Sequence, residues 1–172
     1  SPRAGNPLRD CRARDHHLSM SGPRVLVTGA TGLIGRHLAG PLARRGYEVV
    51  TLSRTGAGLT GDLLAEPEGV VERAGATHLV HLAWHDAPTA RMTAPENLDW
   101  AVASLRLLRA FAAQGGRRAV MVGTCAEYDW AGAGHLAEDA PLRPATPYGA
   151  AKAGTGLAAL GVARTLGLSL VW

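Results

Sequence analysis

Short apolar runs rich in Val and Leu alternate along this chain with longer segments whose apolar residues recur every three or four positions. The short runs read as buried strands and the longer segments as amphipathic helices. Strands that alternate with helices at this spacing predict right-handed crossovers and a parallel, doubly wound sheet. We expect strands over residues 24–28, 48–53, 78–83 and 119–122, a brief strand ending at 61–63, another opening at 169, and helices over 33–45, 66–74, 95–114 and 148–166.

The first predicted strand runs directly into a turn that contains Gly29, Gly32 and Gly35. A strand, a glycine-rich turn and a helix in this order are typical of pyrophosphate binding: one glycine permits the turn, one lets backbone N–H groups approach the phosphates, and one lets the helix pack close to the strand. The positive end of the helix would then hold the pyrophosphate. Taken alone, the triplet is also compatible with a plain turn between buried elements.

The second predicted strand ends at Ser53 and is followed by Arg54. Dinucleotide-binding folds place the residue that reads the adenosine ribose here, about 20 positions after the last glycine. An acid would bind the 2′-hydroxyl and favour NAD, whereas Ser53 and Arg54 suit a 2′-phosphate. We therefore expect NADP, with NAD as the alternative cofactor; a solvated loop arginine is the other interpretation of Arg54.

The side chains that could carry chemistry come late in the chain. Thr124 follows the strand predicted at 119–122, at the sheet edge where ligands bind. Tyr148 and Lys152 are four residues apart at the start of the last predicted helix, and so share one helical face. Lys152 is the only lysine among 18 Lys and Arg residues, so it invites a chemical explanation. The alternative is an ordinary helix start with a snorkelling lysine.

Thr124, Tyr148 and Lys152 together fit a mechanism of proton and hydride transfer. A nearby ammonium favours the phenolate form of a tyrosine, so Tyr148 would exchange a proton with a carbonyl or an alcohol near neutral pH. Thr124 would donate a hydrogen bond to the same oxygen. Hydride would pass to or from a nicotinamide, which is the cofactor's own chemistry.

In combination, these motifs resemble the extended branch of the short-chain dehydrogenase/reductase superfamily, the NAD-dependent epimerase/dehydratase type. The resemblance covers residues 24–172 and includes Gly61-Asp62-Leu63, His81-Leu82-Ala83 and the stretch 138–144 before Tyr148. It implies an α/β fold of Rossmann type, a doubly wound parallel sheet with helices on both faces, and contact of Asp62 with the adenine. By the resemblance, the catalytic residues are Thr124, Tyr148 and Lys152, and the cofactor-binding residues are Gly29, Thr31, Gly32, Leu33, Ile34, Gly35, Ser53, Arg54, Asp62, Leu63, Leu82, Ala83, Tyr148 and Lys152.

Two departures from the family pattern bear on the reaction. Sugar-nucleotide 4,6-dehydratases follow the catalytic Thr with Asp-Glu, which eliminate water as acid and base, whereas this chain has Cys125-Ala126. This difference argues against dehydration. We expect Cys125 to be a small buried filler, with a role as an acid as the alternative. The chain also ends at a predicted strand, before the C-terminal substrate domain of family members. It therefore looks like the cofactor half of an enzyme: a fragment, a frameshifted product or a truncated product.

The leading hypothesis is an NAD(P)-dependent oxidoreductase or epimerase that reduces or epimerises a nucleotide-linked 4-keto sugar, with Tyr148 as acid and base. A reductase of a non-sugar carbonyl on the same scaffold is one alternative. A dinucleotide-binding module without catalysis, either a regulator or an inactive truncated product, is another. Family members often dimerise through the helices predicted at 95–114 and 148–166, so we also predict a homodimer.

Composition limits the other possibilities. The net charge is +4, but residues 1–20 carry four Arg against two Asp, which leaves 14 basic and 12 acidic residues over 21–172. The body is therefore only weakly basic, and we expect no nucleic-acid partner. No apolar run approaches transmembrane length and no secretory segment is visible, so we expect a cytoplasmic protein without a membrane partner.

The first 20 residues and the two cysteines add no further candidate site. Residues 1–20 are polar and aperiodic, and they read as a disordered tail or tag before a dinucleotide-binding domain at 21–172. Cys11 and Cys125 are too few for a disulfide framework. Neither has metal-ligand spacing, and we expect no metal.

Overall fold

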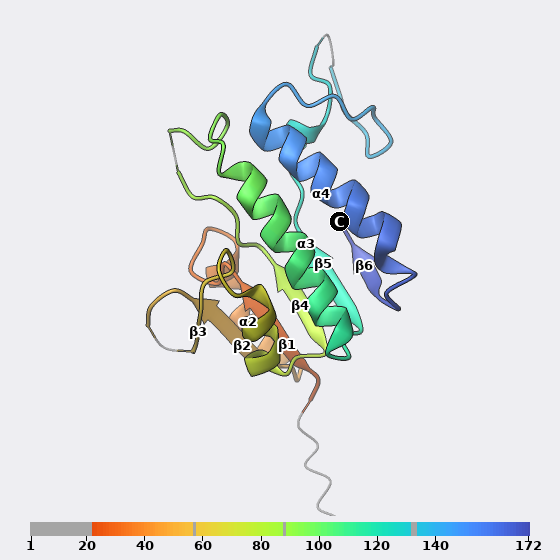
Figure 1. The fold of residues 1–172 in the computed structure, drawn as a ribbon. Coiled ribbons are helices and arrows are strands. Elements are labelled where there is room, and N and C mark those ends of the chain that lie inside the picture. The colour runs from red at the N-terminus through yellow and green to blue at the C-terminus, as the bar shows by residue number, and fades with distance from the viewer. Residues whose placement is uncertain (1–21, 57, 88, 132–133) are drawn as a thin grey trace, which may run out of the picture.

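The computed structural model describes residues 22–56, 58–87, 89–131 and 134–172, so the tail predicted at 1–20 lies outside the described residues. Within the described part, all strand pairs are parallel and form one sheet in the order β3-β2-β1-β4-β5-β6 (Figure 1). From β1 the chain adds β2 and β3 on one side and then β4, β5 and β6 on the other side, which confirms the doubly wound Rossmann-type fold. The strands are β1 (Arg24–Thr28), β2 (Glu48–Ser53), β3 (Leu59–Thr60), β4 (His78–His81), β5 (Arg118–Met121) and β6 (Ser169–Val171).

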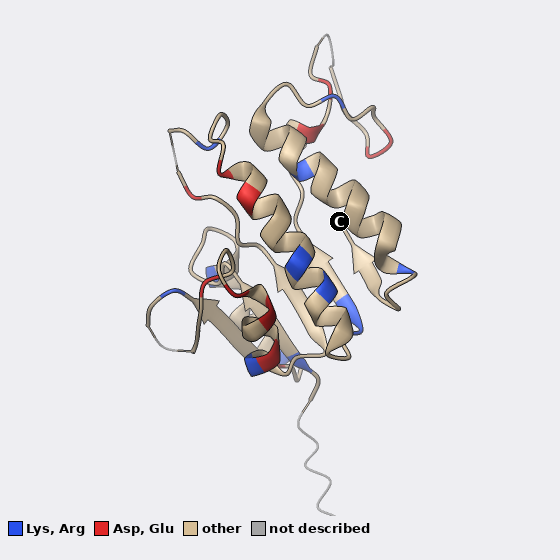
Figure 2. Ribbon diagram, viewed as in Figure 1, with Lys and Arg blue, Asp and Glu red and all other residues tan. Residues whose placement is uncertain are grey.

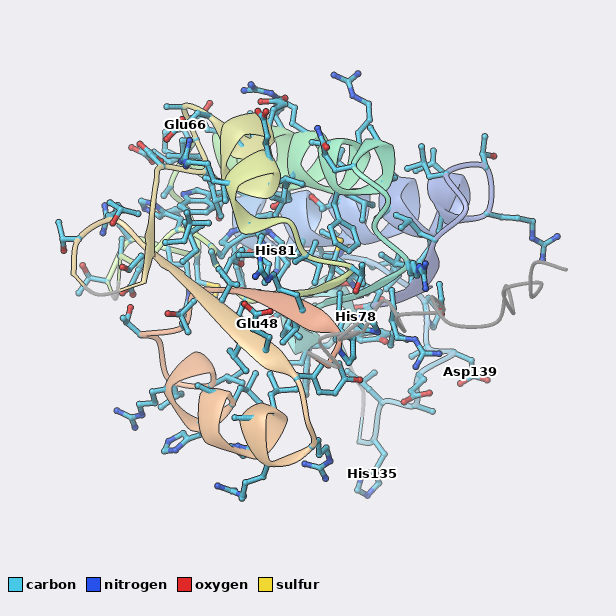
Figure 3. The ribbon with its side chains drawn as sticks, turned by 90° about the horizontal axis from the view of Figure 1, so that it is seen from below. Glu48, Glu66, His78, His81, His135 and Asp139 are labelled. Atoms are coloured by element: carbon cyan, nitrogen blue, oxygen red, sulfur yellow. The ribbon has the colours of Figure 1, made fainter. Side chains whose placement is uncertain are left out.

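Helices cover both faces of the sheet, but unequally. The longer helices α2 (Pro67–Ala74), α3 (Asn97–Ala113) and α4 (Pro147–Ala163) lie on one face, whereas α1 (Ala39–Arg44) lies on the other (Figures 1 and 3). Two single 3-10 turns, η1 (Gly35–His37) and η2 (Cys125–Glu127), follow the first and fifth strands. Val120 on β5 and Val171 on β6 are exposed, on the face of the sheet that carries α1.

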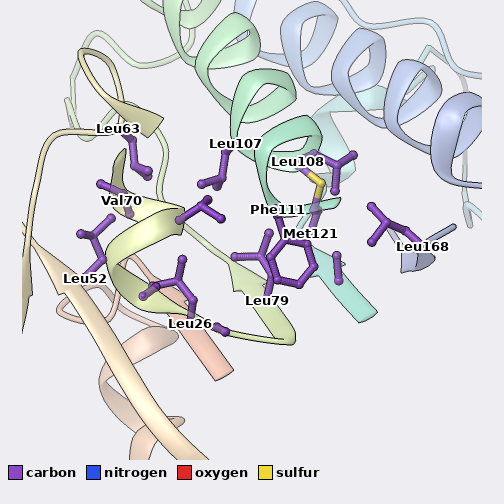
Figure 4. Close-up of a cluster of buried hydrophobic side chains, with 14 of the residues drawn as sticks. Leu26, Leu52, Leu63, Val70, Leu79, Leu107, Leu108, Phe111, Met121 and Leu168 are labelled. Atoms are coloured by element: carbon purple, nitrogen blue, oxygen red, sulfur yellow. The ribbon is translucent and has the colours of Figure 1, made fainter. Parts of the chain in front are cut away.

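The hydrophobic core lies between the sheet and the three longer helices (Figure 4). Parallel strands buried on both faces read as near-continuous apolar runs, which explains why β1 is RVLVT. Burying each large apolar side chain contributes about 1.5–3 kcal/mol. The sheet contributes Leu26, Leu52, Leu79 and Met121, and the helices contribute Val70, Val71, Leu107, Leu108 and Phe111.

The helix predicted over 33–45 is broken into η1 and α1. Pro41 has no N–H to donate to the carbonyl of His37, and its ring crowds that carbonyl, so the chain cannot continue as one helix. The predicted stop at Gly46 is confirmed. Gly46 has a φ of +84°, and the N–H of Tyr47 donates to the carbonyl of Leu42 (3.1 Å), as in a Schellman motif.

Two smaller expectations also change. The helix predicted from residue 66 begins at Pro67, because the first helical position needs no N–H. The segment Gly61-Asp62-Leu63 follows β3 instead of ending it, because the pairing with β2 stops at Thr60.

Residues of both charge signs lie along α2 and α3 (Figure 2). Arg106 on α3 and Glu68 on α2 form an ion pair between the two helices (2.7 Å). Among the described residues, no helix is both long enough and apolar enough to cross a membrane.

Candidate functional site

A cleft of about 630 Å³ opens along the carboxyl edge of the sheet. Its walls come from the loops after β1 to β5 and from the first turns of α4, as expected for a ligand site at a topological switch point. All the predicted site residues except Thr124 line it: Gly29, Thr31, Gly32, Leu33, Ile34, Gly35, Ser53, Arg54, Asp62, Leu63, Leu82, Ala83, Tyr148 and Lys152.

The turn after β1 requires glycine at two positions. Gly29 has a φ of +68°, and a Cβ there would lie 2.8 Å from the backbone nitrogen of Ala83. A Cβ on Gly35 would lie 2.2 Å from the carbonyl oxygen of Gly29. The turn is thus packed backbone against backbone, which is the geometry that a pyrophosphate-binding turn needs.

A chain of buried hydrogen bonds holds this turn against the end of β4. The backbone N–H groups of Leu82 and Ala83 both donate to the hydroxyl oxygen of Thr28 (3.2 Å each). The Thr28 hydroxyl therefore donates to Nδ1 of His81 (2.7 Å), and Nε2 of His81 donates to the hydroxyl of Ser104 on α3 (2.8 Å). His81 is a satisfied core histidine.

This environment keeps His81 neutral. Burial, and to a lesser extent the charge of Lys152, lowers the pKa of His81 to about 3. A neutral imidazole with one donor and one acceptor matches its two hydroxyl partners, whereas an imidazolium would have two donors.

The loops after β2 and β3 form the end of the cleft where the sequence places the adenosine. The hydroxyl of Ser53 donates to the carbonyl of Thr55 (2.8 Å). Oδ1 of Asp62 accepts a hydrogen bond from the N–H of Leu64 (3.0 Å), so its own loop holds this carboxylate at the wall. Arg54 is exposed beside them and supplies positive charge to this end of the cleft.

Lys152 is buried at the other end of the cleft. Its Nζ donates to the carbonyl of Val122 at the end of β5 (2.5 Å) and lies 4.2 Å from the ring centroid of Trp84. Burial lowers the pKa of Lys152 to about 8, and the negative charge of Glu127 opposes this effect. The ammonium is thus held in place by a carbonyl and an aromatic face.

Tyr148 is positioned by the start of α4 and by the loop after β4. Thr146 caps the helix, because its hydroxyl accepts the N–H of Gly149 (3.1 Å). The N–H of Tyr148 itself donates to the carbonyl of Met92 (3.2 Å). The ring meets the edge of Trp84 at 6.4 Å between centroids, and the guanidinium carbon of Arg91 lies 5.4 Å from its centroid.

Thr124 lies next to the cleft but is not among its lining residues; its neighbour Gly123 is. Thr124 is the N-cap of η2, where its hydroxyl oxygen accepts the N–H of Ala126 (3.3 Å). The expectation that Cys125 is buried is wrong: Cys125 is exposed, because it begins this single surface turn.

Two functional candidates were missed from the sequence. Asn97 is buried at the start of α3; its Oδ1 accepts the indole N–H of Trp84 (2.8 Å), and its Nδ2 donates to the carbonyl of Arg91 (2.7 Å). It therefore shapes the loop that carries Trp84. Glu127 is buried behind Thr124, and the available signal was the Thr-x-x-Glu pattern of a capping box.

The sequence profile of the NAD dependent epimerase/dehydratase family matches residues 25–172. The chain belongs to this family. Membership agrees with the glycine turn, the parallel sheet and the shared cleft described above.

Individual proteins of known identity resemble the chain over most of its length. UDP-glucose 4-epimerase of Corynebacterium glutamicum is 28% identical over 159 residues, which cover 85% of this chain and 48% of that protein. The UDP-glucose 4-epimerase of Thermus thermophilus in complex with NAD superposes with a TM-score of 0.73 at 27% identity, covering 86% of this chain and 53% of that one.

A third similar protein is MoeE5, solved in complex with UDP-glucuronic acid and NAD. It is 33% identical to this chain and superposes with a TM-score of 0.71, covering 86% of this chain and 52% of its own. The chain thus spans about half the length of these relatives.

Proposed function

We propose that this protein binds a nicotinamide dinucleotide in the cleft and oxidises, reduces or epimerises a nucleotide-linked sugar by hydride transfer. The observation that carries the proposal is that Tyr148 and Lys152 line the same cleft as the turn formed by Gly29, Gly32 and Gly35. Its relatives support the substrate class, since two are UDP-glucose 4-epimerases and one was solved with UDP-glucuronic acid and NAD. A 4-keto sugar is the specific substrate class we favour.

The described residues fit such a cofactor, because the glycine turn lines the cleft and its Gly29 and Gly35 leave no room for side chains. The glycine turn would hold the phosphates, and Ser53, Arg54 and Asp62 would hold the adenosine. Among these, Arg54 favours NADP over NAD, since a guanidinium pairs with a 2′-phosphate. When bound, the dinucleotide accepts or supplies the hydride.

The protein's own part is to move a proton and to hold the reacting oxygen. In the oxidising direction the phenolate of Tyr148 would take the proton from a sugar hydroxyl, and in the reducing direction its phenol would give a proton to the carbonyl oxygen. The oxygen of Thr124 already accepts a backbone N–H, so its hydroxyl proton is left to be donated to the same sugar oxygen. The ammonium of Lys152 would supply positive charge to the same end of the cleft.

A paired fluorescence titration with NADPH and NADH, followed by a turnover assay on UDP-sugars, tests this function. Binding of either dinucleotide together with turnover supports the proposal. Turnover of a simple ketone but of no UDP-sugar would favour a reductase of non-sugar carbonyls. Binding without any turnover would reduce the protein to a dinucleotide-binding module, and binding of neither would overturn the proposal.

We further propose a homodimer through α3 and α4. Both helices present large apolar side chains to solvent, among them Leu98, Val102, Leu157 and Leu160. Covering them with a second copy would remove this apolar surface from water. Sedimentation equilibrium should show a dimer at micromolar concentration, and Val102→Glu with Leu157→Glu should shift it to monomer; a monomeric unaltered protein would exclude the dimer.

A further inference from the structure

Glu127 is a buried carboxylate directly behind Thr124, and each of its oxygens has a separate partner. Oε1 accepts the backbone N–H of Thr124 (2.6 Å). Oε2 accepts the indole N–H of Trp172 (3.1 Å). A buried carboxylate is unfavourable unless it is hydrogen-bonded, and both oxygens of Glu127 have such a partner.

Trp172 occupies a slot that two glycines provide. A Cβ on Gly123, after β5, would lie 2.5 Å from Nε1 of Trp172. A Cβ on Gly156, one turn after Lys152 on α4, would lie 2.6 Å from the indole ring. The indole is therefore wedged between the end of β5 and α4, and only glycine at both positions permits this packing.

The same indole faces Lys152. Nζ of Lys152 lies 5.2 Å from the centroid of Trp172 and 4.2 Å from that of Trp84, so the ammonium lies against two aromatic faces. The titratable groups around Lys152 are Glu127 from η2, His81 from β4, and Tyr148 one turn earlier on α4. Of these, Glu127 is the one whose charge favours the ammonium.

We propose that Glu127 and Trp172 form a positioning pair that fixes the backbone of Thr124 and holds the ammonium of Lys152 at the wall of the cleft. The roles of Thr124 and Lys152 in catalysis rest on the proposed function, whereas the positioning does not. The pair links the two residues through one carboxylate, so the hydroxyl and the ammonium are pre-organised together before a ligand binds.

The single lysine makes this pair directly measurable. Labelling lysine with ¹³C at Cε gives one resonance, whose titration reports Lys152 alone. The midpoint in the unaltered protein is expected at about 8. In Glu127→Gln, which keeps the size and an oxygen acceptor for Thr124 but removes the charge, the midpoint should fall by about half a pH unit or more. Glu72→Gln, an exposed acid on α2, is the matched control and should leave the midpoint unchanged.

Unfolding cannot imitate this result, because an unfolded variant would move the midpoint upward, toward the ordinary lysine value of 10.5. Trp172→Phe decides the question if Glu127→Gln does not fold. It keeps an aromatic ring but loses the donor to Glu127, and should also lower the midpoint. An unchanged midpoint in the folded variants would overturn the positioning pair.

A second readout connects the pair to catalysis. Both variants should bind the dinucleotide within about twofold of the unaltered protein, and their turnover number should fall about tenfold with little change in KM. Unaltered turnover would overturn the pair's role in catalysis. If the unaltered protein binds no dinucleotide, the proposed function fails, but the lysine titration still decides whether Glu127 positions Lys152.

Discussion

The hydroxyl of Thr28 lies 2.7 Å from Nδ1 of His81, so side chains join the ends of β1 and β4 where the cleft begins. Because burial lowers the pKa of His81 to about 3, against 6.5 in an unfolded chain, the unfolded state binds the extra proton between these values. Stability should therefore decrease as the pH falls from 6.5 toward 3, by about 1.4 kcal/mol per pH unit. Urea unfolding at pH 7 and pH 5 measures this loss.

Two histidine variants show whether His81 is responsible. In His81→Gln the difference in unfolding free energy between pH 7 and pH 5 should shrink by about 2 kcal/mol, since the titrating group is gone. His135→Gln is the control, because His135 lies exposed on a loop away from the core (Figure 3). An equal pH dependence in both variants would assign the acid sensitivity to other groups.

Gly35→Ala should abolish dinucleotide binding and destabilise the fold, because the new Cβ would lie 2.2 Å from the carbonyl oxygen of Gly29. Gly154→Ala is the matched control. Its Cβ would point into open space on α4, so it should raise the unfolding free energy by about 0.5–1 kcal/mol. Calorimetric titration and thermal melts measure both effects, and unimpaired binding by Gly35→Ala would contradict the proposed pyrophosphate turn.

Arg54→Ser should weaken NADPH binding about tenfold or more and leave NADH binding almost unchanged, since a charge-assisted bond to a 2′-phosphate contributes about 1.5–3 kcal/mol. Arg44→Ser on α1 removes a similar charge outside the cleft and should change neither affinity by more than about twofold. Equal losses for the two dinucleotides would show that Arg54 does not read the 2′ position.

Tyr148→Phe should lower turnover by about 10²–10⁴-fold while the dinucleotide still binds. The ring keeps its contacts with Trp84 and Arg91, so only the proton-transfer group is lost. Tyr47→Phe, which pairs edge-on with His78 away from the cleft, is the control. Turnover that survives in Tyr148→Phe would rule out this tyrosine as the acid and base.

The sequence predicted the sheet, the glycine turn and the gathering of the site residues, because these depend on local patterns: apolar runs, glycines and helical spacing. It predicted one helix where Pro41 splits the chain into η1 and α1. It assigned no role to Asn97 or Glu127, because the importance of each comes from side-chain contacts that no residue pattern shows. Glu127 meets Trp172, 45 residues later, and no sequence spacing reveals such a contact.

The strand order has a consequence for the synthesis of this chain. β1 emerges early but lies in the middle of the sheet, paired with β2 on one side and with β4, starting at His78, on the other. The glycine turn at the carboxyl end of β1 packs against Ala83, which is synthesised more than 50 residues later. The residue latest in the sequence that lines the described cleft is Lys152. Contacts of this long sequence separation form slowly. The glycine turn thus leaves the ribosome well before the residues that make it part of a binding site.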